Sequence, residues 1–306
     1  MFYYVIRRLI STIPVLFGIS LLVFFMLRAL PGDPAEVIAG EMATEDEVEL
    51  MRHQLGLDRP VWTQYGLFLV RTIKLDLGRS TRTQNLVTEE IGPRLLNTIL
   101  LAVSATILAC LFGIPAGILA AVRPYTWIDM LVTAGALFGM SMPAFWLGLM
   151  LIVVFSVKLH WFPVGGAGGI EFIVLPAITL AAFLIASVAR NTRSSMLEVL
   201  SQDYITTARS KGVREKMIIL RHALKNSFIP VITVIGLQFG ALLGGTVLTE
   251  TVFAWPGLGR LLVASILSRD YPVIQGIILV FALLFVLTNL AVDLFYIYLD
   301  PKVRYE

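Results

Sequence analysis

Six long apolar runs separated by polar segments set the pattern of the chain. They are 18 to 28 residues long, and an α-helix needs roughly 20 predominantly apolar residues to cross the hydrocarbon core of a bilayer. The run at 172–189 is the shortest and contains Pro176, which a membrane helix tolerates near one end. The pattern therefore predicts an all-α membrane protein with six transmembrane helices. Their ranges are 9–29, 97–122, 130–157, 172–189, 229–249 and 273–297.

The first run has a second interpretation as a secretory signal, because Arg7 and Arg8 precede it like a charged n-region. Its apolar stretch is longer than a typical signal core, and no clear small-residue cleavage site follows it. A retained first transmembrane helix is the favoured interpretation.

The longest polar segment, 31–96, carries eleven acidic and seven basic residues and predicts a small external helical segment. Thr44 and Glu47 form a capping-box pattern at the start of one helix. A second apolar rhythm that begins with Trp62 and Tyr65 predicts another helix, lying against the membrane or against the first helix.

Basic residues in the short loops indicate the orientation, because they are enriched on the cytoplasmic side. With a cytoplasmic N-terminus, the inside loops hold thirteen Lys and Arg residues, whereas the outside short loops hold three, Lys158, Arg260 and Arg269. We therefore expect a multi-pass protein of the cytoplasmic (inner) membrane with both termini in the cytoplasm. The expected organisation is a cytoplasmic N-terminus and first helix at 1–30, an external segment at 31–96, a core of five helices at 97–298 and a cytoplasmic tail at 299–306.

The composition supports a membrane protein and excludes an ordinary cytosolic enzyme. Of the 306 residues, 57% are hydrophobic and 15% are charged, and the mean hydropathy is +0.83. The net charge of +3 is too small and too dispersed to indicate nucleic-acid binding. Cys110 is the one cysteine and the three histidines have no ligand spacing, so we expect neither a disulfide nor a metal site.

Polar residues inside the apolar runs are few, and such residues often mark function. Asp293 lies near the cytoplasmic end of the last run, one turn after Asn289, and is interpreted first as a helix-end residue and second as a relay. Gln238 and Gly240 lie on the fifth run, where glycines four residues apart favour close helix packing or line a pathway. These four residues are candidates for a pathway or for packing.

The cytoplasmic loop 190–228 is long and organised. Asp203 is expected to cap a short helix, Ile205 and Ala208 to supply its apolar face, and Gly212 to end it. Such a helix is suited to docking in a groove of a soluble partner, although a charged, solvated loop is the alternative.

The same loop resembles the signature loop of the dipeptide- and oligopeptide-type permeases of bacterial ABC importers, including the dipeptide and glutathione permeases. The matching residues are Asp203-Tyr204, Ala208-Arg209, Lys211-Gly212, His222-Ala223-Leu224, Asn226 and Pro230. Further matches along the chain are 30–34, 55–58, 253–260 and 269–272. The loop has Thr206-Thr207-Ala208 where the general ABC permease signature opens with Glu-Ala-Ala, and Lys225 near its close, and both departures resemble the peptide branch.

The resemblance implies a fold like that of type I ABC importer permeases and a role as transport subunit rather than enzyme. It implies a second homologous permease in a heterodimer, two ATPase subunits that bind ATP and Mg, and an external substrate-binding protein. It also implies that Asp203, Tyr204, Ala208, Arg209, Lys211 and Gly212 couple the chain to the ATPases. No Gly is followed by Lys, so the chain lacks a phosphate-binding P-loop of its own.

The expected function is inward translocation of dipeptides, oligopeptides or glutathione, and a nickel-chelate permease is the alternative. A proton-coupled secondary transporter is disfavoured because buried charges are scarce. An intramembrane enzyme is disfavoured because Asp293 alone is available at membrane depth, so no catalytic residues are assigned.

Overall fold

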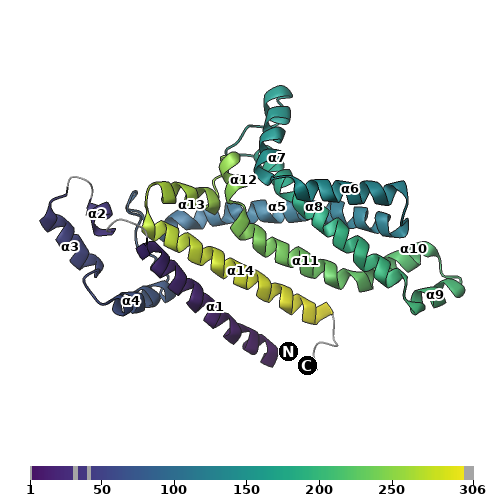
Figure 1. The fold of residues 1–306 in the computed structure, drawn as a ribbon, viewed down its shortest axis with the longest axis horizontal. Coiled ribbons are helices and arrows are strands. Elements are labelled where there is room, and N and C mark those ends of the chain that lie inside the picture. Colours follow the sequence, from purple (N-terminus) through teal and green to yellow (C-terminus); the bar gives the residue numbers. More distant parts are fainter. Residues whose placement is uncertain (1, 30–33, 40–42, 300–306) are drawn as a thin grey trace. The chain divides into compact units, whose positions relative to one another are not determined.

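The computed structural model describes residues 2–29, 34–39 and 43–299, and these residues are almost entirely helical (Figure 1). The predicted all-α fold is confirmed in this part of the chain, where Arg79 and Leu86 form one isolated bridge. The predicted tail at 299–306, apart from Leu299, and most of the motif at 30–34 lie outside the described residues. In chain order the elements are α1 (Phe2–Ala29), α2 (Pro34–Ala39), α3 (Glu45–Leu55), α4 (Val61–Ile73), α5 (Val87–Val122), α6 (Trp127–Ser141), α7 (Ala144–Leu151), the π-helical η1 (Ile152–Lys158), α8 (Glu171–Leu200), α9 (Asp203–Ser210), α10 (Glu215–Met217), the π-helical η2 (Ile218–Ala223), α11 (Leu224–Gly245), α12 (Val247–Val252), α13 (Leu258–Leu267) and α14 (Tyr271–Leu299).

Among the described residues, four helical stretches are long and apolar enough to cross a membrane. They are α5, α8, the continuous stretch Glu215–Gly245 that ends with α11, and the Tyr271–Leu294 part of α14. The bent pair of α6 with α7 and η1 makes a fifth if it counts as one span. The first predicted run forms α1, whose described apolar stretch, Ile10–Phe25, is shorter than these. The structure therefore supports four or five of the six predicted spans.

The third predicted span is not one straight helix. α6 ends at Ser141 and α7 begins at Ala144, and the two parts are bent by 100°. The cause is Pro143, because a proline ring disfavours helical geometry in the residue before it, and Met142 has the extended angles φ −78 and ψ 127. The predicted span 130–157 is therefore a pair of helices broken at Pro143.

The described chain divides into two compact units. Among the described residues, one comprises 98–256 and 285–299, and the other comprises 2–29, 34–39, 43–97 and 257–284. Within the first unit α8 is the central helix, because 67% of its most apolar stretch is buried and it packs against α6, α7 and α11.

Glycines bring α11 close to α14 in the first unit. A Cβ atom at Gly236 would collide with Val292, and one at Gly240 would lie 3.4 Å from Thr288 Cγ2. A Cβ atom at Gly244 would meet nothing within 4 Å. Gly236 and Gly240 therefore serve packing within the chain, whereas Gly244 borders open space.

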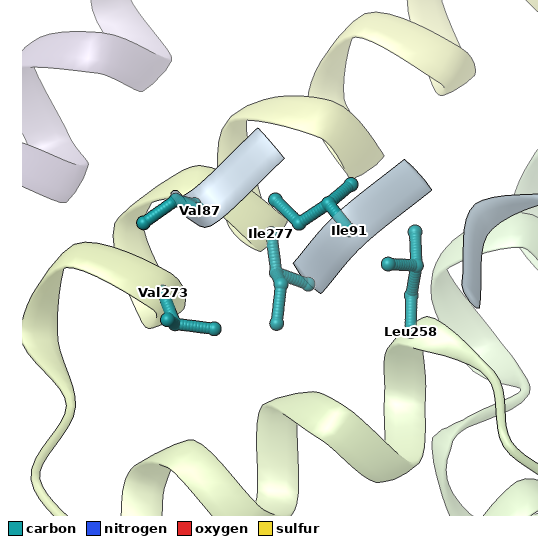
Figure 2. Packing of buried hydrophobic residues seen from close by; sticks show 5 residues of the cluster. All are labelled: Val87, Ile91, Leu258, Val273 and Ile277. Carbon is teal, nitrogen blue, oxygen red and sulfur yellow. The ribbon is translucent and has the colours of Figure 1, made fainter. Parts of the chain in front are cut away.

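The core of the second unit is a small aliphatic cluster contributed by three helices (Figure 2). Val87 and Ile91 come from α5, Leu258 from α13, and Val273 and Ile277 from α14. Full burial of side chains of this size stabilises each by about 1.5–3 kcal/mol relative to exposure. The cluster thus fixes the first turns of α5 and α14 against each other.

A buried carboxylate also holds the loop before α5. Asp270 accepts a hydrogen bond from Ser80 Oγ at 2.5 Å and another from the Thr81 backbone at 3.2 Å. Ser80 Oγ in turn accepts hydrogen bonds from the backbone N–H groups of Arg82 and Thr83. One aspartate therefore positions four consecutive residues of the loop.

Both helices predicted in the external segment are present. Thr44 and Glu47 cap α3 in the predicted capping box. α4 lies against α1 (Figure 1), where the Tyr65 hydroxyl is 2.8 Å from Ser20 Oγ and the Tyr65 ring centroid is 5.2 Å from that of Phe24.

Candidate coupling site

α9 is the short helix that the sequence predicts in the cytoplasmic loop. It ends at Ser210, and Gly212 follows as the predicted stop. Gly212 has φ +75, in the left-handed region that favours glycine. Its N–H donates to the carbonyl of Arg209 at 2.9 Å, and the N–H of Val213 donates to the carbonyl of Ala208 at 3.2 Å. This pair of bonds is a Schellman motif, so Gly212 occupies the predicted stop.

The start of α9 differs from the prediction. Gln202 occupies the N-cap position with the extended angles φ −73 and ψ 147, and no side chain caps the helix. Asp203 is already helical, so its side chain is not at the capping position. Its charge instead lies in the first turn, where the helix dipole favours an anion.

The apolar face of α9 is turned towards its own chain. Ile205 is fully buried in a cluster with Met196 of α8 and with Ile218 and Ala223 of η2, and Ala208 packs against the same cluster. The expectation of an apolar face open to a groove is therefore wrong for Ile205, which is fully buried, whereas Ala208 is half-buried. The local chain covers that face, because the loop folds back after Gly212.

The surface that α9 exposes is polar and charged. The Tyr204 side chain is 43% exposed, and its hydroxyl accepts a hydrogen bond from Asn226 Nδ2 at 2.8 Å. Arg209 Nη2 donates to Glu215 Oε1 at 2.7 Å, and this bond raises the pKa of the guanidinium above its ordinary value. Lys211 is exposed beside them. A partner at α9 would therefore meet hydroxyl, amide and cationic groups.

An ion pair close to the start of this loop joins α6 to α8. Asp129 is 5% exposed, and its two carboxylate oxygens accept hydrogen bonds from Arg193 Nε at 2.5 Å and Nη2 at 2.7 Å. The Tyr125 backbone N–H donates to the same carboxylate at 3.0 Å. The sequence analysis missed this pair, and its one signal was a lone carboxylate at the edge of the run 130–157.

The four candidate pathway residues lie on α11 and α14. Gln238 Nε2 donates to Ser187 Oγ of α8 at 3.4 Å, so its partner is a neighbouring helix. The Asn289 side-chain oxygen is buried and has no hydrogen-bond partner in the part of the chain that the structure describes. Asp293 is half-buried, and Gly240 packs against α14. The structure therefore brings Gly240 next to the helix that carries Asn289 and Asp293.

The sequence analysis also did not predict that a second carboxylate, that of Glu250, is buried. Glu250 of α12 is fully buried, and its Oε1 accepts hydrogen bonds from Thr98 Oγ1 of α5 at 2.7 Å and from Thr246 Oγ1 at 2.9 Å. The spacing of Thr246 and Glu250, four residues apart on a helix, was the available signal. Among the described residues no group of three or more His, Cys, Asp or Glu could hold a metal ion.

Comparison with known protein families covers almost the whole chain. Residues 113–305 match the family described as "Binding-protein-dependent transport system inner membrane component". Residues 1–102 match the N-terminal family of the same transport-system membrane components.

Curated relatives match over nearly the full length. The glutathione transport system permease protein GsiC of Escherichia coli O6:H1 (strain CFT073) is 49% identical over 303 residues, which cover 99% of each chain. GsiC of Escherichia coli (strain K12) and GsiC of Shigella dysenteriae serotype 1 (strain Sd197) are each 48% identical with the same coverage.

The fold matches a solved structure as well. A chain of the MetNI methionine ABC transporter, in an inward-facing crystal form, has a TM-score of 0.60 and 18% identity. The match covers 69% of the present chain and 96% of the other, and at this identity it supports the fold alone. Together with the two family matches, these similarities establish that the chain belongs to the family of binding-protein-dependent transport system inner membrane components.

Proposed function

We propose that the chain is the permease subunit of an ATP-driven importer that carries glutathione or another small peptide across the cytoplasmic membrane. The observation that carries the proposal is the 48–49% identity to glutathione permeases over 99% of both chains. In this proposal the chain pairs with a second, similar permease, and an external binding protein delivers the cargo.

Two ATPase subunits supply the energy, because the sequence contains no Gly-Lys pair for a phosphate-binding loop. α9 is the contact through which their nucleotide state reaches the membrane helices. The support for this assignment is the exposed polar surface of α9 around Tyr204, Arg209 and Lys211. The buried side chain of Ile205 anchors the opposite face of the helix to the rest of the chain. Asp203, Ala208 and Gly212 set the start, the inner face and the end of that contact.

In the proposed orientation both termini and the loop 190–228 are cytoplasmic, and the segment 31–96 is external. The support is the excess of basic residues in the loops assigned to the inside. The core at 97–298 carries the pathway, for which Gln238, Gly240, Asn289 and Asp293 are the candidate lining residues. Gln238 and Gly240 also serve helix packing, as their contacts with α8 and α14 indicate.

Uptake by a reconstituted importer tests the function. The chain is reconstituted in lipid vesicles with its second permease, both ATPases and the binding protein, and labelled glutathione is added outside. We expect uptake that needs ATP and the binding protein and that unlabelled glutathione or a dipeptide inhibits. A non-hydrolysable ATP analogue provides the control and should give no accumulation.

Two other results would each reject the proposal in a different way. Uptake of a nickel chelate, with no uptake or inhibition by peptides, would favour the alternative cargo. Uptake driven by a pH gradient in the absence of ATP would instead indicate a secondary transporter.

A further inference from the structure

We propose that α4 lies within the bilayer, in the leaflet at the C-terminal end of α1, with one face of the helix against lipid acyl chains. α4 is thus the part of the external segment 31–96 that enters the membrane. The proposal concerns the second unit alone, and it does not depend on the cargo.

The contact between α4 and α1 lies along the length of α1 and not beyond its end. The Tyr65 hydroxyl is 2.8 Å from Ser20 Oγ, and the Tyr65 ring centroid is 5.8 Å from that of Phe17. α1 ends at Ala29, so Ser20 lies about 13 Å from that end at a rise of 1.5 Å per residue. The predicted span 9–29 is just long enough to cross the roughly 30 Å hydrocarbon core. The middle of α4 therefore lies beside the interior of the span.

One face of α4 exposes apolar side chains. Trp62, Gly66, Val70 and Ile73 are spaced three or four residues apart and thus share a face. The exposed fractions of Trp62, Val70 and Ile73 are 68%, 52% and 80%. Exposure of this much apolar surface to water is unfavourable, whereas contact with hydrocarbon removes that cost.

α1 exposes apolar side chains in the same way. Ile13 is 63% exposed and Leu22 is 62% exposed, and they lie on either side of the level of Ser20 at which α4 makes contact. A protein partner shaped to α4 would leave these α1 side chains uncovered, whereas the hydrocarbon of the bilayer covers both helices. The ring contact of Tyr65 with Phe24 joins the two helices at this level.

The rest of α4 carries its polar groups. Gln64, Arg71 and Thr72 line a cavity of about 600 Å³ in the second unit, away from the apolar face. Lys74, directly after the helix, is exposed. Long cationic side chains such as Arg71 and Lys74 can extend to the headgroup level while their stems stay in an apolar medium. α4 thus has the amphipathic pattern of a helix in a membrane leaflet.

Collision measurements on a spin label test the depth of α4. Cys110 is replaced by Ala, and single cysteines are introduced as Val70→Cys and Ile73→Cys in the full chain, reconstituted in vesicles of phosphatidylethanolamine and phosphatidylglycerol. Each cysteine carries a nitroxide, and its collision rates are measured with oxygen, which concentrates in hydrocarbon, and with a water-soluble nickel chelate. Leu22→Cys is the control for lipid exposure and Glu45→Cys the control for water.

We expect the ratio of oxygen to nickel collisions at positions 70 and 73 to equal that at position 22 and to exceed that at position 45 severalfold. A ratio at positions 70 and 73 equal to that at position 45 would place α4 in water. Low collision rates with both reagents would place it against protein. A label at position 22 that collides mainly with nickel would show that α1 itself is not in the bilayer, and each of these three results overturns the proposal.

Discussion

Asp129 on α6 is a buried carboxylate whose ion-pair partner lies on α8. Its carboxylate is almost fully buried, whereas the side chain of its partner Arg193 is 27% exposed. Removal of one member of such a pair leaves the other charge without compensation in a poorly solvated place. The two parallel hydrogen bonds also fix the rotation of α6 about α8, because they join both oxygens to one guanidinium.

Replacement of Asp129 by Asn should lower the free energy of unfolding by about 3 kcal/mol, the lower end of the range for breaking a buried ion pair. The measurement is the denaturant-induced unfolding of the purified chain in detergent. Arg209→Ala is the matched control, because the Arg209–Glu215 pair is 45% and 54% exposed and should contribute less than about 1 kcal/mol. Equal losses in the two variants would contradict the assigned importance of burial.

At the scale of elements, the position of α9 depends on the left-handed conformation of Gly212, which ends the helix. Gly212 has no atoms within 4 Å of the place where a Cβ would lie, so a side chain there acts through backbone conformation and not through a clash. In the left-handed region most residues cost about 1–2 kcal/mol, whereas Asn tolerates it well.

Gly212→Val should therefore lower the amount of cargo transported per ATP hydrolysed, and Gly212→Asn should leave it close to that of the unchanged protein. The measurement is uptake and hydrolysis in the same reconstituted vesicles, at matched amounts of permease. If both variants transport normally, the end of α9 does not take part in coupling.

The elements that the sequence predicts well are those determined by neighbouring residues. The capping box of Thr44 with Glu47 and the stop at Gly212 each depend on a few consecutive positions, and both occur in the structure. Prolines are less informative, because Pro176 lies inside a continuous helix whereas Pro143 separates two. The difference depends on whether neighbouring helices compensate for the lost backbone hydrogen bond, which local sequence does not encode.

The local sequence pattern also could not predict what the apolar face of α9 packs against. An apolar face at Ile205 fits a partner groove or the helix's own chain equally well, and the packing of Met196 and Ile218, 9 and 13 residues away, decides the outcome. The same holds for the buried carboxylates. Asp129 and Glu250 find their partners 64 and 152 residues away in the sequence.

For the whole molecule, the orientation in the membrane is the property that can be tested most directly. In a Cys110→Ala background, Glu45→Cys and Leu267→Cys should react with a membrane-impermeant thiol reagent in intact cells, because their loops are assigned to the outside. Leu267 is 82% exposed, so reagent access is not limited by burial. Lys211→Cys is the control for the cytoplasmic side and should react only after lysis. The reverse pattern would invert the topology.

The length of α8 has a mechanical consequence for the assembled importer. Its 30 residues make a rod about 45 Å long, about 15 Å longer than the hydrocarbon core is thick. In the proposed orientation, the helix is therefore long enough to extend from α9 to the opposite membrane surface, and we expect a displacement of α9 to tilt it. Pro176, in the second turn of α8, is the point where a proline weakens helical stiffness. Bending under such a load would concentrate there, at the end of the lever furthest from α9.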